Sequence, residues 1–159
     1  MVTLIRTDAE NDDLLSLVAL LDEELKLRDG EDHYFFAQFN KLAGIIGAVV
    51  AYVNDEPIGC GAFKRFSDTE AEIKRMFVKP ESRGQRIAAN ILTELESWAQ
   101  ENQFTACVLE TGFKQPEAIA LYKRSGYTVI PNYGQYSDVS ASVCMRKGLN
   151  AAVSYSPNS

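Results

Sequence analysis

The residues Arg83-Gly84-Gln85-Arg86-Ile87-Ala88 place a glycine and two guanidinium groups at the start of an expected helix. A helix start offers backbone N–H groups without partners inside the helix, together with the positive end of the helix dipole. Glycine lets the backbone approach a ligand closely, and arginine adds charge-assisted hydrogen bonds. The pattern predicts a site for an anion such as phosphate. The alternative is that Gly84 is only a turn residue and that both arginines are solvated.

The elements around this loop can be predicted from hydrophobic periodicity and turn residues. We expect strands at residues 2–7, 43–53, 58–66, 71–78, 104–110, 127–131 and 139–147, and helices at residues 12–27, 31–39, 85–101 and 116–125. A turn is expected at residues 54–57, and Gly126 caps the last helix. This order predicts a mixed α/β (α+β) fold with a central sheet of about seven strands and about four helices.

Composition indicates a soluble globular chain. The chain has 159 residues, of which 46% are hydrophobic and 24% are charged, so it is long enough to bury a substantial core. We expect one domain at residues 1–149. Residues 150–159 lack periodicity and end in Ser, Pro and Asn, which predicts a flexible C-terminal tail.

The net charge bears on partners and location. A formal charge of −6 and a pI near 4.8 argue against a broad phosphate-binding surface and therefore against nucleic acid. A cationic small molecule or peptide suits this charge better. The N-terminus lacks the apolar core of a signal peptide, and the apolar run at residues 44–53 is too short to span a bilayer. We expect a cytoplasmic protein without membrane association.

The cysteines and the histidine do not suggest a metal site. Cys60, Cys107 and Cys144 lie far apart in apolar, strand-like segments, which predicts buried reduced thiols. The sequence has no C-x-x-C pair, and His33 is its one histidine. We therefore expect no metal, zinc included.

Two motifs together resemble the GCN5-related N-acetyltransferase (GNAT) superfamily. The stretch MFVKPESRGQRIAANIL is similar to its acetyl-CoA motif, Arg/Gln-x-x-Gly-x-Gly/Ala, after a strand that ends in Val. Arg83 and Ala88 match the outer positions, and Arg86 stands where the family usually has its central glycine. The stretch QPEAIALYKRSGY is similar to the family's late helix, with Gln115 in place of the common Asn. The resemblance covers residues 2–148.

This resemblance implies acetyl-CoA as the cosubstrate and a set of residues that bind it. The backbone around Met76 and Val78 would pair with the pantetheine arm, and the amides of residues 83–88 would hold the pyrophosphate. The implied cofactor set is Met76, Phe77, Val78, Arg83, Gly84, Gln85, Arg86, Ile87, Ala88 and Gln115. At Arg86 we expect early helical φ and ψ, which do not require glycine.

Glu72 is the first candidate for the general base that the resemblance implies. An amine must lose a proton before it attacks a thioester, and a glutamate at this spacing serves that role in the family. Strand alternation places Glu72, Met76 and Val78 on one face, with Glu72 about 20 Å from Val78 at ~3.3 Å per residue. The alternative is a solvent-facing strand carboxylate paired with Lys64, Lys74 or Arg75. Glu70 and Glu110 remain rivals.

Aromatic residues are candidates for the leaving-group acid and the acceptor pocket. Tyr122 matches the family's helix tyrosine, which implies that its hydroxyl protonates or hydrogen-bonds the CoA sulfur; the alternative is a core aromatic. His33 and Tyr34 fall where early helices shape the acceptor pocket in this superfamily. Tyr133 and Tyr136 are candidates for the opposite wall.

The combined interpretation is an acetyl-CoA-dependent N-acetyltransferase that acetylates a primary amine by direct attack in a ternary complex. A covalent route through Cys107 is disfavoured because no base lies near it in the sequence. The alternative is a CoA-binding regulatory module with little turnover, which the departures at Arg86 and Gln115 keep open. A nucleotide-binding domain is disfavoured because the sequence has neither the Gly-Lys-Ser/Thr loop nor a full Gly-x-Gly-x-x-Gly motif. The identity of the acceptor amine, which is a small molecule or a peptide, is left open. Whether the chain forms a homodimer is left open as well.

Overall fold

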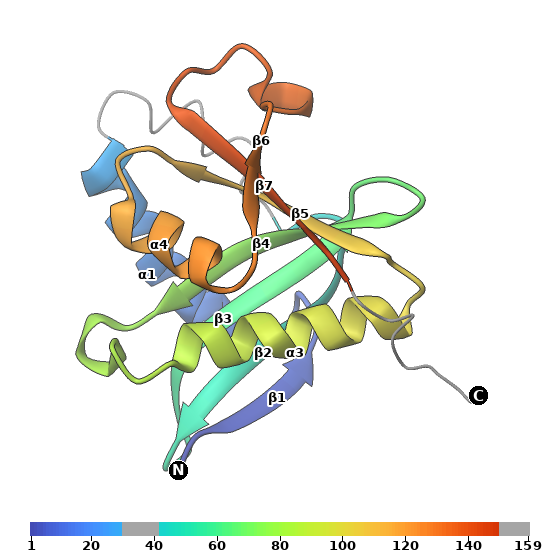
Figure 1. Cartoon of the computed structure of the whole chain (residues 1–159). Coiled ribbons are helices and arrows are strands. Elements are labelled where there is room, and N and C mark those ends of the chain that lie inside the picture. Colours follow the sequence, from blue (N-terminus) through green and yellow to red (C-terminus); the bar gives the residue numbers. More distant parts are fainter. Residues whose placement is uncertain (30–41, 150–159) are drawn as a thin grey trace.

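The computed structural model describes residues 1–29 and 42–149 (Figure 1). Its elements are β1 (Thr3–Thr7), α1 (Asp12–Asp29), β2 (Ile45–Val53), β3 (Glu56–Arg65), β4 (Glu70–Val78), the 3-10 helix η2 (Pro80–Ser82), α3 (Ile87–Glu101), β5 (Ala106–Gly112), α4 (Pro116–Arg124), β6 (Thr128–Ile130), the 3-10 helix η3 (Gly134–Tyr136) and β7 (Ser142–Gly148). The predicted helix at residues 31–39 and the predicted tail at residues 150–159 lie outside the described residues.

The strands form one mixed sheet, which confirms the predicted fold class. Its order is β1-β2-β3-β4-β5-β7-β6. β4 and β5 are parallel, and all other neighbours are antiparallel. Three α-helices occur in residues 1–29 and 42–149, against about four expected. The expected turn at residues 54–57 is tighter than predicted, because Asn54 and Asp55 take φ of 51° and 68° and β3 already begins at Glu56.

Helices cover both faces of the sheet. In Figure 1, α3 crosses in front of the sheet and α1 lies behind it. Ile91 and Leu95 of α3 pack in one apolar cluster with Phe63, whereas Leu14 and Leu17 of α1 belong to a second cluster. Each buried leucine or isoleucine contributes about 1.5–3 kcal/mol. The two clusters therefore fix where α1 and α3 lie over the central strands.

A glycine in β3 lets α3 lie close to the sheet. A Cβ atom on Gly61 would come within 2.5 Å of the Met76 Sδ atom and 2.8 Å of the Leu95 Cδ1 atom. Only the absence of a side chain permits this approach. Because α3 begins directly after the loop at residues 83–86, its close packing also fixes the position of that loop.

A β-bulge interrupts β4. Cys60 and Ala62 of β3 pair with Phe77 and Lys74, so two steps along β3 correspond to three along β4. Arg75 in this interval takes a φ of 59°, in the left-handed region. An extra residue of this kind reverses the alternation of side chains beyond it.

The bulge corrects one prediction about the site. The side chains on the α3 face of β4 are Ile73, Met76 and Val78, and those on the α1 face are Glu72, Lys74 and Phe77. The prediction that Glu72 shares a face with Met76 and Val78 is therefore wrong. It assumed an unbroken period of two, and the additional residue at Arg75 shifts that period by one.

The three cysteines are buried free thiols, as predicted. Burial raises the pKa of the Cys107 thiol to about 12. Among the helices of residues 1–29 and 42–149, none has both the length and the apolar character needed to cross a bilayer.

Candidate active site

The site begins where β4 and β5 separate. Their parallel pairing has three positions and ends at Glu72 opposite Val108, although β4 continues to Val78 and β5 to Gly112. Figure 1 shows the two strands diverging beside α4. Past Glu72, the edge of β4 that faces β5 therefore has no strand partner among the described residues, and a ligand could pair with this edge where the backbone is not already hydrogen-bonded.

A cleft of about 870 Å³ opens along this unpaired edge. Its walls come from the end of β4, the following loop, the first turn of α3, one side of α4, and Leu21 and Glu24 of α1. The expected cofactor residues that line it are Met76, Phe77, Val78, Arg83, Gly84, Arg86, Ile87, Ala88 and Gln115. Gln85 does not line it.

The first turn of α3 presents unpaired amides to the cleft. The first hydrogen bond of this helix runs from the Asn90 amide to the Arg86 carbonyl. The amides of residues 87–89 therefore precede the helical ladder, and no side chain of the described residues caps them. Ile87 and Ala88 both line the cleft. This arrangement suits a phosphate group.

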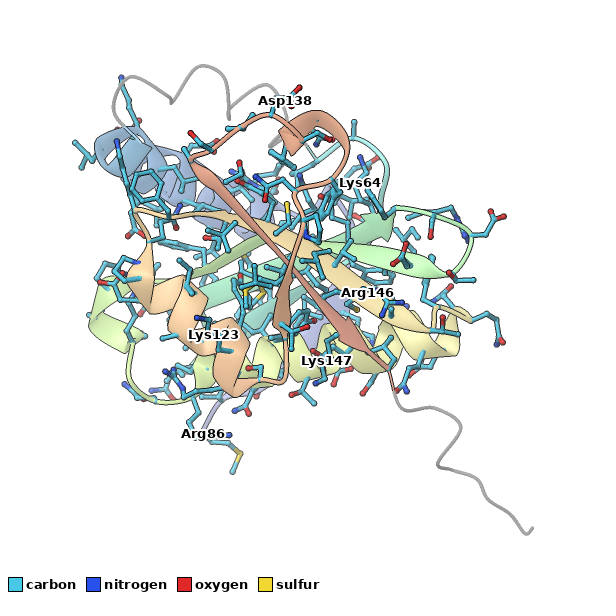
Figure 2. The ribbon with its side chains drawn as sticks, turned by 45° about the horizontal axis from the view of Figure 1, so that its top comes forward. Lys64, Arg86, Lys123, Asp138, Arg146 and Lys147 are labelled. Carbon is cyan, nitrogen blue, oxygen red and sulfur yellow. The ribbon has the colours of Figure 1, made fainter. Side chains whose placement is uncertain are left out.

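Arg86 takes the left-handed conformation that glycine adopts most readily. Its φ is 63° and its ψ is 17°, at the N-cap of α3. The expectation of early helical dihedral angles at this position is therefore wrong, and α3 begins at Ile87, two residues after the predicted start at residue 85. A side chain in this region costs about 1–2 kcal/mol. Figure 2 shows Arg86 at the periphery of the molecule.

The side chain of Arg83 braces the loop. Its Nε atom donates to the Val78 carbonyl at 2.8 Å, and its Nη2 atom donates to the Glu24 Oε1 atom at 2.7 Å. The guanidinium also lies 5.7 Å from the centre of the Phe77 ring. Arg83 thus ties the loop to β4 and α1, and its guanidinium is already engaged.

Glu72 lies at the point where β4 and β5 separate, and it is nearly buried, with 7% of its side chain exposed. The Tyr133 hydroxyl donates to the Glu72 Oε2 atom at 2.9 Å. Burial, followed by the charge of Glu72, raises the pKa of Tyr133, so this hydroxyl stays a donor at neutral pH. Within the described residues, the Glu72 Oε1 atom accepts no hydrogen bond.

Glu72 lines a second, smaller cavity of about 100 Å³. Its other charged residues are Lys74, Arg75 and Glu110, and it is also lined by Tyr122. The Lys74 Nζ atom lies 3.9 Å from the Glu72 Oε2 atom. Burial lowers the pKa of Lys74, and the charges of Glu72 and Glu110 oppose that change.

The rival carboxylates are separated by the structure. Glu70 accepts from the Arg146 Nε atom at 2.9 Å and from the Ser67 hydroxyl at 3.0 Å. This ion pair lowers the pKa of Glu70, and the residue lines neither cavity. Glu110 lies in the same cavity as Glu72 and keeps its place as a rival.

Tyr122 stands between the two cavities and lines both. It is 7% exposed, and its ring meets that of Tyr127 edge to face with centroids 5.9 Å apart. Burial, followed by the charge of Glu110, raises its pKa, which keeps the hydroxyl protonated. Its side chain thus has a core contact and a position in the cleft.

The four residues expected in the acceptor pocket lie in different places. The Tyr133 hydroxyl contacts Glu72 directly. Tyr136 is 1% exposed and packs in a cluster with Cys144, so it does not line either cavity. His33 and Tyr34 lie outside the described residues.

Sequence reasoning named Lys74 only as a possible partner of a solvent-facing Glu72, and it missed both the burial of this pair and the contribution of α1. Lys74 follows Glu72 by two residues, so both occupy one face of a buried strand, and that pairing was a detectable signal. Arg75, named as another possible partner of Glu72, is also buried, but it forms an ion pair with Asp22 of α1 that no local pattern predicts.

Comparison with known proteins agrees with this geometry. Residues 8–127 match the profile of the Acetyltransferase (GNAT) family. A protein of Azospirillum brasilense named IAA acetyltransferase is 33% identical over 152 residues, covering 93% of this chain and 98% of that protein.

Solved structures show the same fold. A candidate acyl-CoA N-acyltransferase from Klebsiella pneumoniae has a TM-score of 0.79 and 29% identity, covering 94% of this chain and 98% of that one. A GNAT acetyltransferase from Elizabethkingia anophelis, solved with acetyl-CoA bound, has a TM-score of 0.69 and 19% identity, covering 93% and 98%. The match over most of the sequence confirms the predicted family and enzyme class: this chain belongs to the acetyltransferase (GNAT) family.

Proposed function

We propose that this chain transfers the acetyl group of acetyl-CoA, the cosubstrate of its family, to a primary amine by direct attack in a ternary complex. One observation carries the proposal. The cleft that begins at the uncapped amides of α3 and the cavity that holds Glu72 share Met76, Gln115 and Tyr122 in their walls. A long cofactor in the cleft would bring its thioester to the residues that also face the acceptor.

The cofactor would occupy the cleft along its length. Its pyrophosphate would bind the amides of residues 87–89, where the helix dipole favours negative charge. Its pantetheine amides would pair with the free edge of β4 in place of the missing β5 partner, as an added strand does. The departure of β5 after Val108 supplies the room for this pairing.

Glu72 would take the proton of the acceptor amine. A protonated amine has no lone pair, and the Glu72 Oε1 atom, without a partner among the described residues, would accept its proton. The neutral nitrogen would then attack the thioester carbonyl and form the new C–N bond as the C–S bond breaks, and the second proton that this nitrogen loses would replace the one that Tyr122 gives to sulfur. Tyr122 would donate its hydroxyl proton or a hydrogen bond to the departing sulfur, and its raised pKa keeps that proton available.

The thiols of the chain do not support a covalent acyl-enzyme. Cys107, three residues before Glu110 in β5, is fully buried. Burial raises the pKa of its thiol, which disfavours the reactive thiolate. Direct transfer therefore needs fewer assumptions.

A thiol-release assay tests the function. Purified protein would be mixed with acetyl-CoA and a panel of acceptors that includes polyamines, amino acids, aminoglycosides, peptides with free termini, and the IAA that names the Azospirillum relative. We expect thiol release with at least one amine, together with an acetylated product by mass spectrometry. Tight CoA binding without release for any acceptor would instead support the regulatory-module alternative.

The acidic net charge of −6 leads us to propose a cationic amine as acceptor, with no nucleic acid partner and no membrane partner. We also propose a cytoplasmic location and a homodimer. Size-exclusion chromatography with light scattering tests the dimer.

A further inference from the structure

Lys74 is a buried lysine beside the proposed base. Its side chain is 7% exposed, and its Nζ atom lies 3.9 Å from the Glu72 Oε2 atom. Lysine is almost never this buried unless it is paired, because removal of an ammonium from water is costly. An apolar side chain of similar volume would fill the same space in β4 without that cost. The position of the charge, within the cavity that holds Glu72 and Glu110, therefore calls for a chemical role.

The charged and titratable groups around Lys74 and its neighbours Glu72 and Glu110 come from five parts of the described chain. They are Glu72 and Arg75 of β4, Lys64 of β3, Glu110 of β5, Tyr122 of α4, and Tyr133 and Tyr136 of the segment between β6 and β7. The charge of Arg75 is offset by Asp22 of α1. Among the described residues, the carboxylates of Glu72, Glu110 and Asp22 thus balance the cations of Lys64, Lys74 and Arg75.

The contacts of Glu72 are directional. Tyr133 and Lys74 both approach the Oε2 atom, at 2.9 and 3.9 Å, from different elements. This arrangement holds the carboxylate through one oxygen and, within residues 1–29 and 42–149, leaves the other oxygen for a proton. A positive charge beside a carboxylate also favours its ionised form.

We propose that Lys74 is a positioning residue, which keeps Glu72 ionised and oriented toward the acceptor amine while Glu110 holds the ammonium from the β5 side. This inference rests on the proposed function. It assigns Lys74 no contact with the substrate. Its effect on the reaction is transmitted through the charge and orientation of Glu72.

The test compares Lys74→Met with Lys74→Arg, and uses Lys79→Met as a control. Lys79 follows β4 directly, pairs with Glu56 at 3.4 Å and lines neither cavity. We expect the acidic limb of the kcat/KM profile to move to higher pH by about one to two pH units in Lys74→Met. The variant should lose on the order of tenfold near pH 6 and recover most of its activity near pH 9, where more of the amine is already deprotonated.

Lys74→Arg keeps the charge and should restore the wild-type limb, and Lys79→Met should leave it unchanged. A Lys74→Met variant whose activity falls by one factor at every pH would overturn the proposal, since that result indicates a structural role alone. An unchanged profile would overturn it as well.

A measurement on the wild-type protein covers the case in which Lys74→Met does not fold. Lysine side chains labelled with ¹³C at the ε position would be titrated by NMR, with Lys74 assigned by its absence in Lys74→Arg. We expect Lys74 to remain protonated at pH 7 despite the lowering effect of burial. A neutral Lys74 at that pH would rule out the proposed role. Absence of thiol release from the wild type with every amine is a separate failure, which concerns the proposed function itself.

Discussion

Two buried glutamates in this protein have the same kinds of partners but different surroundings. Glu96 of α3 accepts from the Tyr127 hydroxyl at 2.9 Å through Oε2 and from the Lys147 ammonium at 2.9 Å through Oε1. Glu72 of β4 has Tyr133 and Lys74 as its partners, and both approach Oε2. Each glutamate is less than 10% exposed.

The difference lies in the second oxygen. Both oxygens of Glu96 are hydrogen-bonded, so this glutamate joins α3 to β7 and to Tyr127 in a closed network. Glu72 has one oxygen without a partner among the described residues, and it lines a cavity. A buried carboxylate with both oxygens satisfied stabilises a fold, whereas one with an uncommitted oxygen at a cavity can exchange a proton. Variants of the two networks therefore test the assignment of Glu72.

Glu72→Gln should produce the greatest loss of activity. We expect kcat to fall by about 10²- to 10⁴-fold at neutral pH, because the amide cannot accept the proton of the amine. The loss should be smaller at high pH, where more of the acceptor is already the free base. Steady-state kinetics from pH 6 to about pH 10 measures both effects.

Glu96→Gln is the matched control for this change and should retain kcat within about twofold. Full activity of Glu72→Gln with an unchanged pH profile would remove Glu72 from the mechanism. Glu110→Gln, measured in the same assay, tests whether Glu110 rather than Glu72 is the general base.

Tyr122→Phe should lower kcat by about 10- to 100-fold, because the hydroxyl acts when negative charge develops on sulfur. The affinity for acetyl-CoA should stay nearly constant, since the ring and its contact with Tyr127 remain. Stopped-flow thiol release and equilibrium titration measure the two quantities. Tyr127→Phe removes a hydroxyl of the Glu96 network and serves as control. Wild-type turnover in Tyr122→Phe would assign Tyr122 to the core alone.

Arg86→Glu concerns the opposite end of the cleft from Glu72. If the guanidinium forms a charge-assisted hydrogen bond with a CoA phosphate, its loss costs about 1.5–3 kcal/mol, which is roughly 10- to 150-fold in affinity. Turnover at saturating cofactor should change little. The wild type should bind more weakly at high salt, and the variant should lack most of this dependence.

Calorimetric titration at two salt concentrations measures the effect of Arg86→Glu. Lys123→Glu is a suitable control, because Lys123 belongs to the neighbouring helix α4 and does not line the cleft. Equal affinities for wild type and Arg86→Glu would mean that backbone amides hold the phosphates without Arg86.

The smallest changes in activity are expected in the Glu96 network, where the effect is on stability. Glu96→Gln should lower the free energy of unfolding by about 1–3 kcal/mol, because it weakens two hydrogen bonds of a buried charge. Glu72→Gln should change stability less, since one of its oxygens makes no hydrogen bond within the described chain. Urea denaturation followed by circular dichroism compares the two variants. Equal losses would remove the distinction between the closed and open networks.

Much of the fold was predictable from local patterns. The strands and helices lie close to their predicted positions because hydrophobic periodicity and turn residues act over a few neighbours. The cofactor loop was predictable for the same reason: Gly84, the helix start and the spacing to Ala88 are all contained within six residues. The left-handed conformation of Arg86 was missed because an arginine rarely takes a positive φ, although the glycine that the family usually has at this position was a sign of it.

The sequence by itself determined the order of the elements, the loop that offers amides to an anion, and the late helix that carries Tyr122. The tertiary structure decided which face Glu72 occupies, because the bulge at Arg75 depends on pairing with β3. It also decided that Arg83 is engaged by Glu24 and that Tyr133 meets Glu72. These contacts join residues 59 and 61 positions apart, and such contacts form only when packing brings distant segments together.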